Sequence, residues 1–221
     1  MLRRGLAAVL LQRRCCLSDR PAARHGFAFA PRLRLRTPLR RRPSMSTQSI
    51  LAAQQRLERL VRQRPGVAQV RDVPATALWE GGGKTQTRHP DGNLIHTDLP
   101  QELGGDGERV SPGWLLRAAL ASCAVTRIAM LAAERGMQPQ RLEAQVTSDT
   151  DLHGLLGLRR EDGQHIPAGP LAVHVQVSIS VPGAPDAEVR EMVEQAMRVS
   201  PMLSALAEAV PVRLDIDSGT P

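Results

Sequence analysis

One long apolar segment constrains the fold of this chain more than any other feature. It runs from Ser111-Pro112 to Arg135-Gly136 and contains the stretch LLRAALASCAVTRIAM. Serine caps the free amides at a helix start, proline fits the first helical position, and glycine commonly ends a helix. Alanine is plentiful all round the predicted helix. We therefore expect one long helix that is buried on several sides, with the rest of the domain arranged around it.

Strand-like segments lie on both sides of this helix. Before it, two runs flank Asp91-Gly92, a strong hairpin signal because both turn residues tolerate positive φ. After it, a strand begins near Arg141, and LAVHVQVSISV alternates strictly between an apolar and a polar face. The short stretch GGGK at Gly81–Lys84 is interpreted as a turn, because it lacks the spacing of a phosphate-binding loop.

Two further helices and a last strand complete the predicted order. An amphipathic helix over Ile50–Arg64 ends at Pro65-Gly66, and a second over Asp186–Val199 breaks at Ser200-Pro201 and resumes to Ala209. VPVRLDID is expected to close the chain as a strand. Because strands and helices do not alternate regularly, the order predicts an α+β fold with antiparallel sheets rather than a parallel one.

The positive charge of the chain is concentrated at its N-terminus. Residues 1–44 hold twelve arginines and one acid, Asp19, so a total net charge of +7 leaves −4 for residues 45–221. With no basic stripe and only 2% aromatic residues, the folded part is not expected to bind nucleic acid. The N-terminal composition is typical of an organelle transit peptide, which predicts a mitochondrial matrix protein, with the plastid as the alternative. A basic tail, or a true start at Met45, stays open.

We expect no segment to insert into a membrane, because none approaches the roughly 20 apolar residues that a spanning helix needs. Cys15 and Cys16 fall within the predicted transit peptide, which leaves Cys123 as the one thiol of residues 45–221. One thiol forms neither an internal disulfide nor a cysteine-based metal site, so we expect no metal and no cofactor. The length suits one domain, preceded by a helical arm over residues 45–66.

Several of these motifs together resemble one known family. The hairpin, the LGG loop, the proline before the long helix, the Ala-Ser-Cys within it and EMVEQAMRVSPMLSAL are similar, in this order, to OsmC and the organic hydroperoxide resistance proteins. The resemblance covers residues 67–217. It implies an OsmC-like α+β fold in which antiparallel sheets flank a long buried central helix and a second helix. It also implies an intertwined homodimer with its site at the dimer interface.

The resemblance also implies a chemistry, peroxiredoxin-like reduction of organic hydroperoxides by a pair of cysteines. Cys123 matches the cysteine that attacks the peroxide. Three other family positions differ: the resolving cysteine is replaced by Ser200, the acid after the helix-opening proline by Gly113, and the activating arginine by Gln86. Arg88, two residues further on the same strand face, is one candidate substitute, and Glu102 in the glycine loop is a candidate for the missing acid.

Cys123 has two interpretations on the residues alone. An isolated cysteine in an alanine-rich helix is commonly a packing residue. A reactive cysteine must be a thiolate, which needs nearby positive charge, and Arg127 lies one helical turn away on the same stripe. Around the thiol we predict a substrate pocket lined by Leu116, Leu120, Met130, Met197 and Ser200. His174 is interpreted as an exposed or hydrogen-bonded histidine rather than a general base.

Two functions follow from these observations. The first is the reduction of organic hydroperoxides in oxidative stress defence, with Cys123, Arg88, Arg127 and Glu102 as catalytic candidates. Since the sulfenic acid would have no internal partner, an external thiol reductant is required. The alternative is a catalytically degenerate dimer that binds a small hydrophobic ligand or a partner, with Cys123 as packing.

Overall fold

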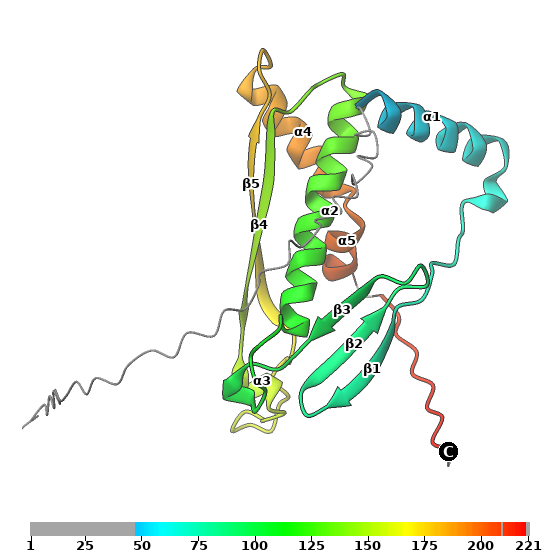
Figure 1. The fold of residues 1–221 in the computed structure, drawn as a ribbon. Helices are drawn as coiled ribbons and strands as arrows, with labels where there is room; N and C mark the ends of the chain where they lie inside the picture. The colour runs from blue at the N-terminus through cyan, green and yellow to red at the C-terminus, as the bar shows by residue number, and fades with distance from the viewer. Residues whose placement is uncertain (1–46, 209, 220–221) are drawn as a thin grey trace, which may run out of the picture. The chain divides into compact units, whose positions relative to one another are not determined.

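The structure is a computed structural model that describes residues 47–208 and 210–219. The transit peptide predicted for residues 1–44 lies outside the described residues and stays a prediction. The predicted arm is the helix α1, Thr47–Gln63, which ends at a 3-10 turn, η1, over Pro65–Val67 (Figure 1). α1 buries no residue completely, and Leu57 and Leu60 on it are exposed. Its Gln54 side chain donates a hydrogen bond to Glu134 at the end of the central helix.

The predicted hairpin is part of a three-stranded antiparallel sheet. Its strands are β1, Thr76–Gly81, β2, Lys84–Arg88, and β3, Leu94–Thr97, in that order across the sheet. Asp91 and Gly92 form the turn between β2 and β3, with Gly92 at φ +94°, as the sequence predicts. The GGGK stretch is the turn between β1 and β2. Leu78 and Trp79, on opposite faces of β1, are both exposed, so neither face is covered at this strand in the single chain.

The central helix α2, Pro112–Glu134, has the predicted limits. The Ser111 hydroxyl accepts a hydrogen bond from the Trp114 amide at 3.2 Å, and proline occupies the first turn. A second 3-10 turn, η2, over Gln101–Leu103, lies in the loop before α2. In the single chain the C-terminal half of α2 is well buried, whereas Trp114 and Leu116 near its start are exposed. Burial on several sides is therefore reached only over the second half of the helix.

A two-stranded antiparallel sheet and two helices pack on α2 (Figure 1). The strands are β4, Arg141–Thr150, and β5, Pro170–Ser180, joined by a loop with the short helix α3, Leu152–Leu155. The helices are α4, Asp186–Arg198, and α5, Pro201–Ala207, which the predicted break at Ser200-Pro201 separates. The core lies between α2, α4 and the apolar face of this sheet, and its buried members are Ile128, Leu131, Ala132, Met137, Val189, Met192 and Ala196.

Two sequence predictions were wrong for the single chain. The segment VPVRLDID forms no strand, because no strand edge pairs with it among the described residues. The expectation that no segment is long and apolar enough to cross a membrane was also wrong, since α2 meets both criteria by length and composition. Its contacts with β4, α1, α4 and α5 are those of the core helix of a folded domain.

Candidate active site

Cys123 and Ser200 meet although they are 77 positions apart in the sequence. Cys123 lies midway along α2 and is partly buried, and Ser200 lies between α4 and α5 and is fully buried. The Cys123 Sγ and Ser200 Oγ atoms are 3.3 Å apart, within hydrogen-bond distance for sulfur. Ser200 precedes the first turn of α5, yet its hydroxyl makes no capping hydrogen bond there. The Ser200 hydroxyl is therefore available to form a hydrogen bond with the Cys123 thiol.

Arg127 lies one turn after Cys123 on α2, which brings the two side chains to the same face of the helix. Its Nη1 atom donates to the Met130 sulfur at 3.6 Å, and its Nε atom is buried with no hydrogen-bond partner among the described residues. A buried guanidinium donor without an acceptor is costly. Arg127 can therefore still bind an anionic group, such as a thiolate formed one turn away.

The other two catalytic candidates do not reach the thiol in the single chain. Arg88 is exposed at the end of β2, and Glu102 is exposed in η2. Neither side chain makes a hydrogen bond or ion pair with any other residue that the structure describes. Arg88 does share a sheet face with Gln86, as expected from strand alternation. Their proposed roles stay predictions.

The residues predicted to line a pocket have different surroundings. Leu120 is fully buried, Leu116 is exposed, and Met130 accepts the Arg127 contact. Met197 lines an open groove of about 950 Å³ between β5 and α4, which does not include Cys123. The predicted lining therefore does not form one enclosed pocket around the thiol in the single chain.

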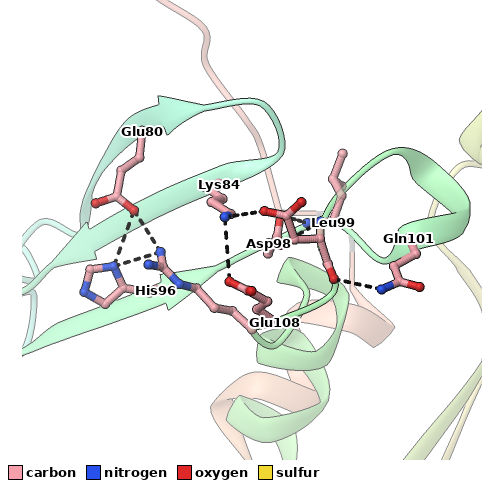
Figure 2. A network of polar contacts seen from close by, with 9 residues as sticks. Glu80, Lys84, His96, Asp98, Leu99, Gln101 and Glu108 are labelled. Atoms are coloured by element: carbon pink, nitrogen blue, oxygen red, sulfur yellow. Dashed lines mark hydrogen bonds and ion pairs between the residues drawn. The ribbon is translucent and has the colours of Figure 1, made fainter.

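A polar network that the sequence analysis missed holds the loop between β3 and α2 (Figure 2). The Asp98 carboxylate is buried and accepts backbone hydrogen bonds from Leu99 at 2.8 Å and Asp106 at 3.1 Å. Lys84 forms an ion pair with Asp106, which raises the pKa of Lys84 and lowers that of Asp106. Each partner stabilises the charged form of the other. The network fixes the loop that leads into α2.

A second cluster lies on one face of the three-stranded sheet (Figure 2). The Arg109 guanidinium donates to Glu80 at 2.9 Å and lies 3.3 Å from the His96 ring. The Arg109 hydrogen bond is the main reason that the pKa of Glu80 is lowered, with His96 adding to it. The loop before α2 supplies Arg109 and the strands supply the other two. Sequence spacing gave no signal for this cluster, because its members come from separate segments.

Histidine and carboxylate side chains elsewhere do not suggest another reactive site. His174 lies on the exposed face of β5 and is 3.3 Å from Asp149, which fits its interpretation as a surface residue. Within residues 47–208 and 210–219, no group of three or more histidine, cysteine or acidic side chains gathers in a way that could hold a metal ion.

The sequence of this chain matches the model of one protein family. Residues 105–215 match the family model described as OsmC-like protein. The chain belongs to the OsmC family. The match includes both Cys123 and Ser200 but begins after β3, so it leaves out Gln86 and Arg88. Among curated proteins, none matches the sequence of this chain.

Solved structures share the OsmC fold with this chain. An OsmC-like protein from Mycoplasma pneumoniae is 16% identical, with 64% of this chain and 91% of that one covered and a TM-score of 0.52. An OsmC-like protein of unknown function from Vibrio cholerae is 12% identical, with 62% and 94% covered and a TM-score of 0.51. The organic hydroperoxide resistance protein OhrB of Bacillus subtilis is 20% identical, with 67% and 100% covered and a TM-score of 0.42. At these identities the first two support the α+β fold alone.

Proposed function

We propose that this OsmC-family protein reduces organic hydroperoxides with Cys123 as its single reactive thiol and an external thiol as reductant. The family supports a role in peroxide resistance or stress response. The observation that carries the finer proposal is the contact between the Cys123 thiol and the otherwise unbonded Ser200 hydroxyl, one helical turn from a guanidinium with a free donor.

The proposed reaction has three steps. The Cys123 thiolate attacks one peroxide oxygen and breaks the O–O bond, and the other oxygen leaves as an alcohol after taking up a proton. Cys123 is thereby oxidised to a sulfenic acid. An external thiol then condenses with the sulfenic acid, releasing water and forming a mixed disulfide, and a second external thiol restores Cys123. Two external thiols thus supply the two electrons that reduce the peroxide.

Ser200 and Arg127 have distinct roles in this proposal. The Ser200 hydroxyl donates a hydrogen bond to the thiolate and to the oxygen that develops negative charge during attack. Arg127 supplies a positive charge one helical turn from the attacking sulfur, in place of the family arginine that Gln86 replaces. Because Ser200 carries no thiol, it does not resolve the sulfenic acid, which is why the reductant must come from outside.

The direct test is to trap the first product. The full chain, with Cys15 and Cys16 replaced by serine, is treated with cumene hydroperoxide and then with dimedone, which labels sulfenic acids. The proposal predicts one label per chain, on Cys123, formed faster with cumene hydroperoxide than with hydrogen peroxide. If Cys123 is labelled only after the protein is unfolded, the thiol is a packing residue and the proposal is wrong.

Arg127 and Arg88 can be compared directly. Arg127→Met keeps the length of the side chain and removes its charge, and we expect it to slow alkylation of Cys123 by iodoacetamide at pH 7 by about tenfold, because a nearby cation favours the thiolate. The matched variant Arg88→Met removes an exposed arginine that contacts no thiol in the single chain. If Arg88→Met slows alkylation and Arg127→Met does not, the activating cation is Arg88.

The proposal includes a homodimer. The exposed Leu78 and Trp79 of β1 and the exposed Trp114 and Leu116 of α2 leave more apolar surface uncovered than a folded single chain usually does. A second copy that covers these surfaces would also close the surroundings of Cys123, which is only partly buried in the single chain. The alternative function, binding of a small hydrophobic ligand or partner, is favoured by one observation: no cation touches Cys123 Sγ among the described residues.

A further inference from the structure

Helix α1 carries an apolar stripe that the fold leaves partly uncovered. Residues three, four and seven positions apart share one face of a helix. On α1 these positions are held by Ile50, Ala53, Leu57, Leu60 and Val61. The first half of α1 packs on α2, where Gln54 bonds to Glu134 (Figure 1). In the second half Leu57 and Leu60 are 61% and 41% exposed, so the stripe continues past this contact into solvent.

The opposite side of α1 is basic. Arg59 lies opposite the apolar stripe, with Arg56 and Arg62 on the two sides of Arg59. Arg62 is paired at 2.7 Å with Glu58, the one acid of the helix. Arg56 and Arg59 form no ion pair with any other residue that the structure describes. The helix therefore presents an apolar side and an unneutralised cationic side along the same few turns.

The segment around α1 is basic in an otherwise acidic domain. Residues 47–71 hold five arginines and one acid, a net charge of +4. Since residues 45–221 together carry −4, residues 72–221 carry −8. Val67 and Val70, which follow the helix, are 42% and 77% exposed. Positive charge and exposed apolar side chains thus gather in the same short segment.

We propose that α1 docks this protein on the surface of an anionic lipid bilayer. The helix lies in the plane of the interface, with Leu57, Leu60 and Val61 against the acyl chains and its arginines at the lipid phosphates. It does not cross the bilayer, because a spanning helix needs about 20 mainly apolar residues and α1 has 17, several of them charged. α1 lies outside residues 105–215, which match the family model, so this surface belongs to the arm of this chain.

A bilayer fits α1 better than a protein surface because it contacts both sides of the helix at once. A protein groove that received Leu57 and Leu60 would leave Arg59, on the opposite side, in water. An acidic protein surface that received the arginines would leave the leucines exposed. At a lipid interface the apolar side meets acyl chains, while the long arginine side chains reach back to the phosphate groups.

The charge distribution also orients the molecule at such a surface. A negative lipid surface attracts the segment of net charge +4 and repels the remainder of net charge −8. The protein therefore approaches with α1 first and keeps its acidic part in solution. This orientation depends on the sign of the surface charge, so the same helix is expected to bind a neutral bilayer much more weakly.

A fluorescent probe on α1 of the full chain tests the contact. Cys15, Cys16 and Cys123 are replaced by serine, and Leu57→Cys, or Leu60→Cys in a second variant, is labelled with the environment-sensitive dye NBD. The vesicles contain phosphatidylcholine with about one third phosphatidylglycerol, an anionic lipid. The arginines of residues 1–44 also attract such vesicles, but the probe reports only on its own position on α1.

The probe at either leucine position is expected to brighten at least about threefold with these vesicles, because the apolar side of the helix enters the acyl boundary. It is also expected to be quenched by lipids that carry doxyl groups on their acyl chains. The matched control is Gln55→Cys on the polar side of α1, which is exposed and is expected to stay nearly as dim as in buffer. Vesicles of phosphatidylcholine alone are expected to brighten neither position.

A second pair of variants tests the role of charge. Arg56→Gln with Arg59→Gln is expected to raise the lipid concentration for half-maximal brightening of the Leu57 probe at least about fivefold. Arg141→Gln with Arg213→Gln removes the same charge from two exposed positions outside α1 and is expected to change it much less.

The proposal is wrong if both leucine probes stay dim with anionic vesicles, or if the Gln55 probe brightens equally. It is also wrong if brightening follows the protein concentration without lipid, since a second copy then covers α1. An equal response to neutral vesicles, or parental behaviour of the Arg56 and Arg59 variant, contradicts the recognition of anionic lipid. Since the labelled variants lack Cys123, none of these outcomes depends on peroxide chemistry.

Discussion

Cys123→Ser is expected to lower the consumption of organic hydroperoxides by the purified protein, with an external thiol present, by at least about 100-fold. Serine has nearly the same shape but its hydroxyl is not ionised at neutral pH, so the variant keeps the packing and loses the nucleophile. Consumption is followed by a ferric-xylenol orange assay with cumene hydroperoxide. The thiol-only background rate is measured without protein and subtracted.

Ser122→Ala is the matched control, because Ser122 is the neighbour of Cys123 on α2 and is exposed. It is expected to keep the activity of the parent chain. The Cys123→Ser protein must also show the parent's circular dichroism and thermal midpoint, so that loss of activity is not loss of fold. If Cys123→Ser consumes hydroperoxide as fast as the parent, Cys123 is not the reagent and the proposed function is wrong.

The elements that the sequence predicts well are those that local chemistry determines. α2 begins and ends where Ser111, Pro112 and Gly136 predict, since capping depends on adjacent residues. The turn at Asp91-Gly92 and the break at Ser200-Pro201 are local in the same sense. The strict alternation of LAVHVQVSISV predicted β5 and its apolar face correctly. None of these elements depends on a second copy of the chain.

The predictions that failed concern strand pairing and burial, which depend on what lies beside a segment in space. VPVRLDID has a clear strand pattern, but a strand exists only when an edge pairs with it, and alternation does not identify that edge. In the same way, the apolar composition of α2 predicted burial on several sides, while Trp114 and Leu116 remain exposed in the single chain. Apolar patterning shows that a face has to be covered, without showing which segment or which copy covers it.

The candidate site could be predicted only in part. Cys123, Arg127 and Met130 fall on one helical stripe, so their proximity follows from the sequence. The contact of Ser200 with Cys123 was indicated by the family resemblance alone, because residues on separate helices are brought together by packing. Neither the resemblance nor a local pattern predicted the ion pairs of Glu80 with Arg109 and of Lys84 with Asp106, because these pairs join strands to an irregular loop.

Ser200→Cys is expected to give Cys123 an internal partner and so change the chemistry from a single-cysteine to a two-cysteine reaction. The sulfur and the hydroxyl oxygen are 3.3 Å apart, so a shift of about 1 Å brings two sulfur atoms to disulfide distance. After one equivalent of cumene hydroperoxide, the introduced thiol attacks the sulfenic acid, releases water and forms a disulfide. Dimedone labelling is expected to fall at least about tenfold, because a thiol held within reach outcompetes a dissolved trap.

The experiment is carried out with Cys15 and Cys16 replaced by serine, and the disulfide is identified by the loss of both free thiols and by peptide mapping. Ser178→Cys is the matched control: it also adds one thiol, but on the exposed face of β5, whose side chains point away from the core. That variant is expected to label with dimedone like the parent. If Ser200→Cys forms no disulfide while Cys123 is still oxidised, the two side chains do not meet in solution as they do here. The hydrogen-bond role proposed for Ser200 would then have to be given up, whereas the role of Cys123 as the attacking thiol would stand.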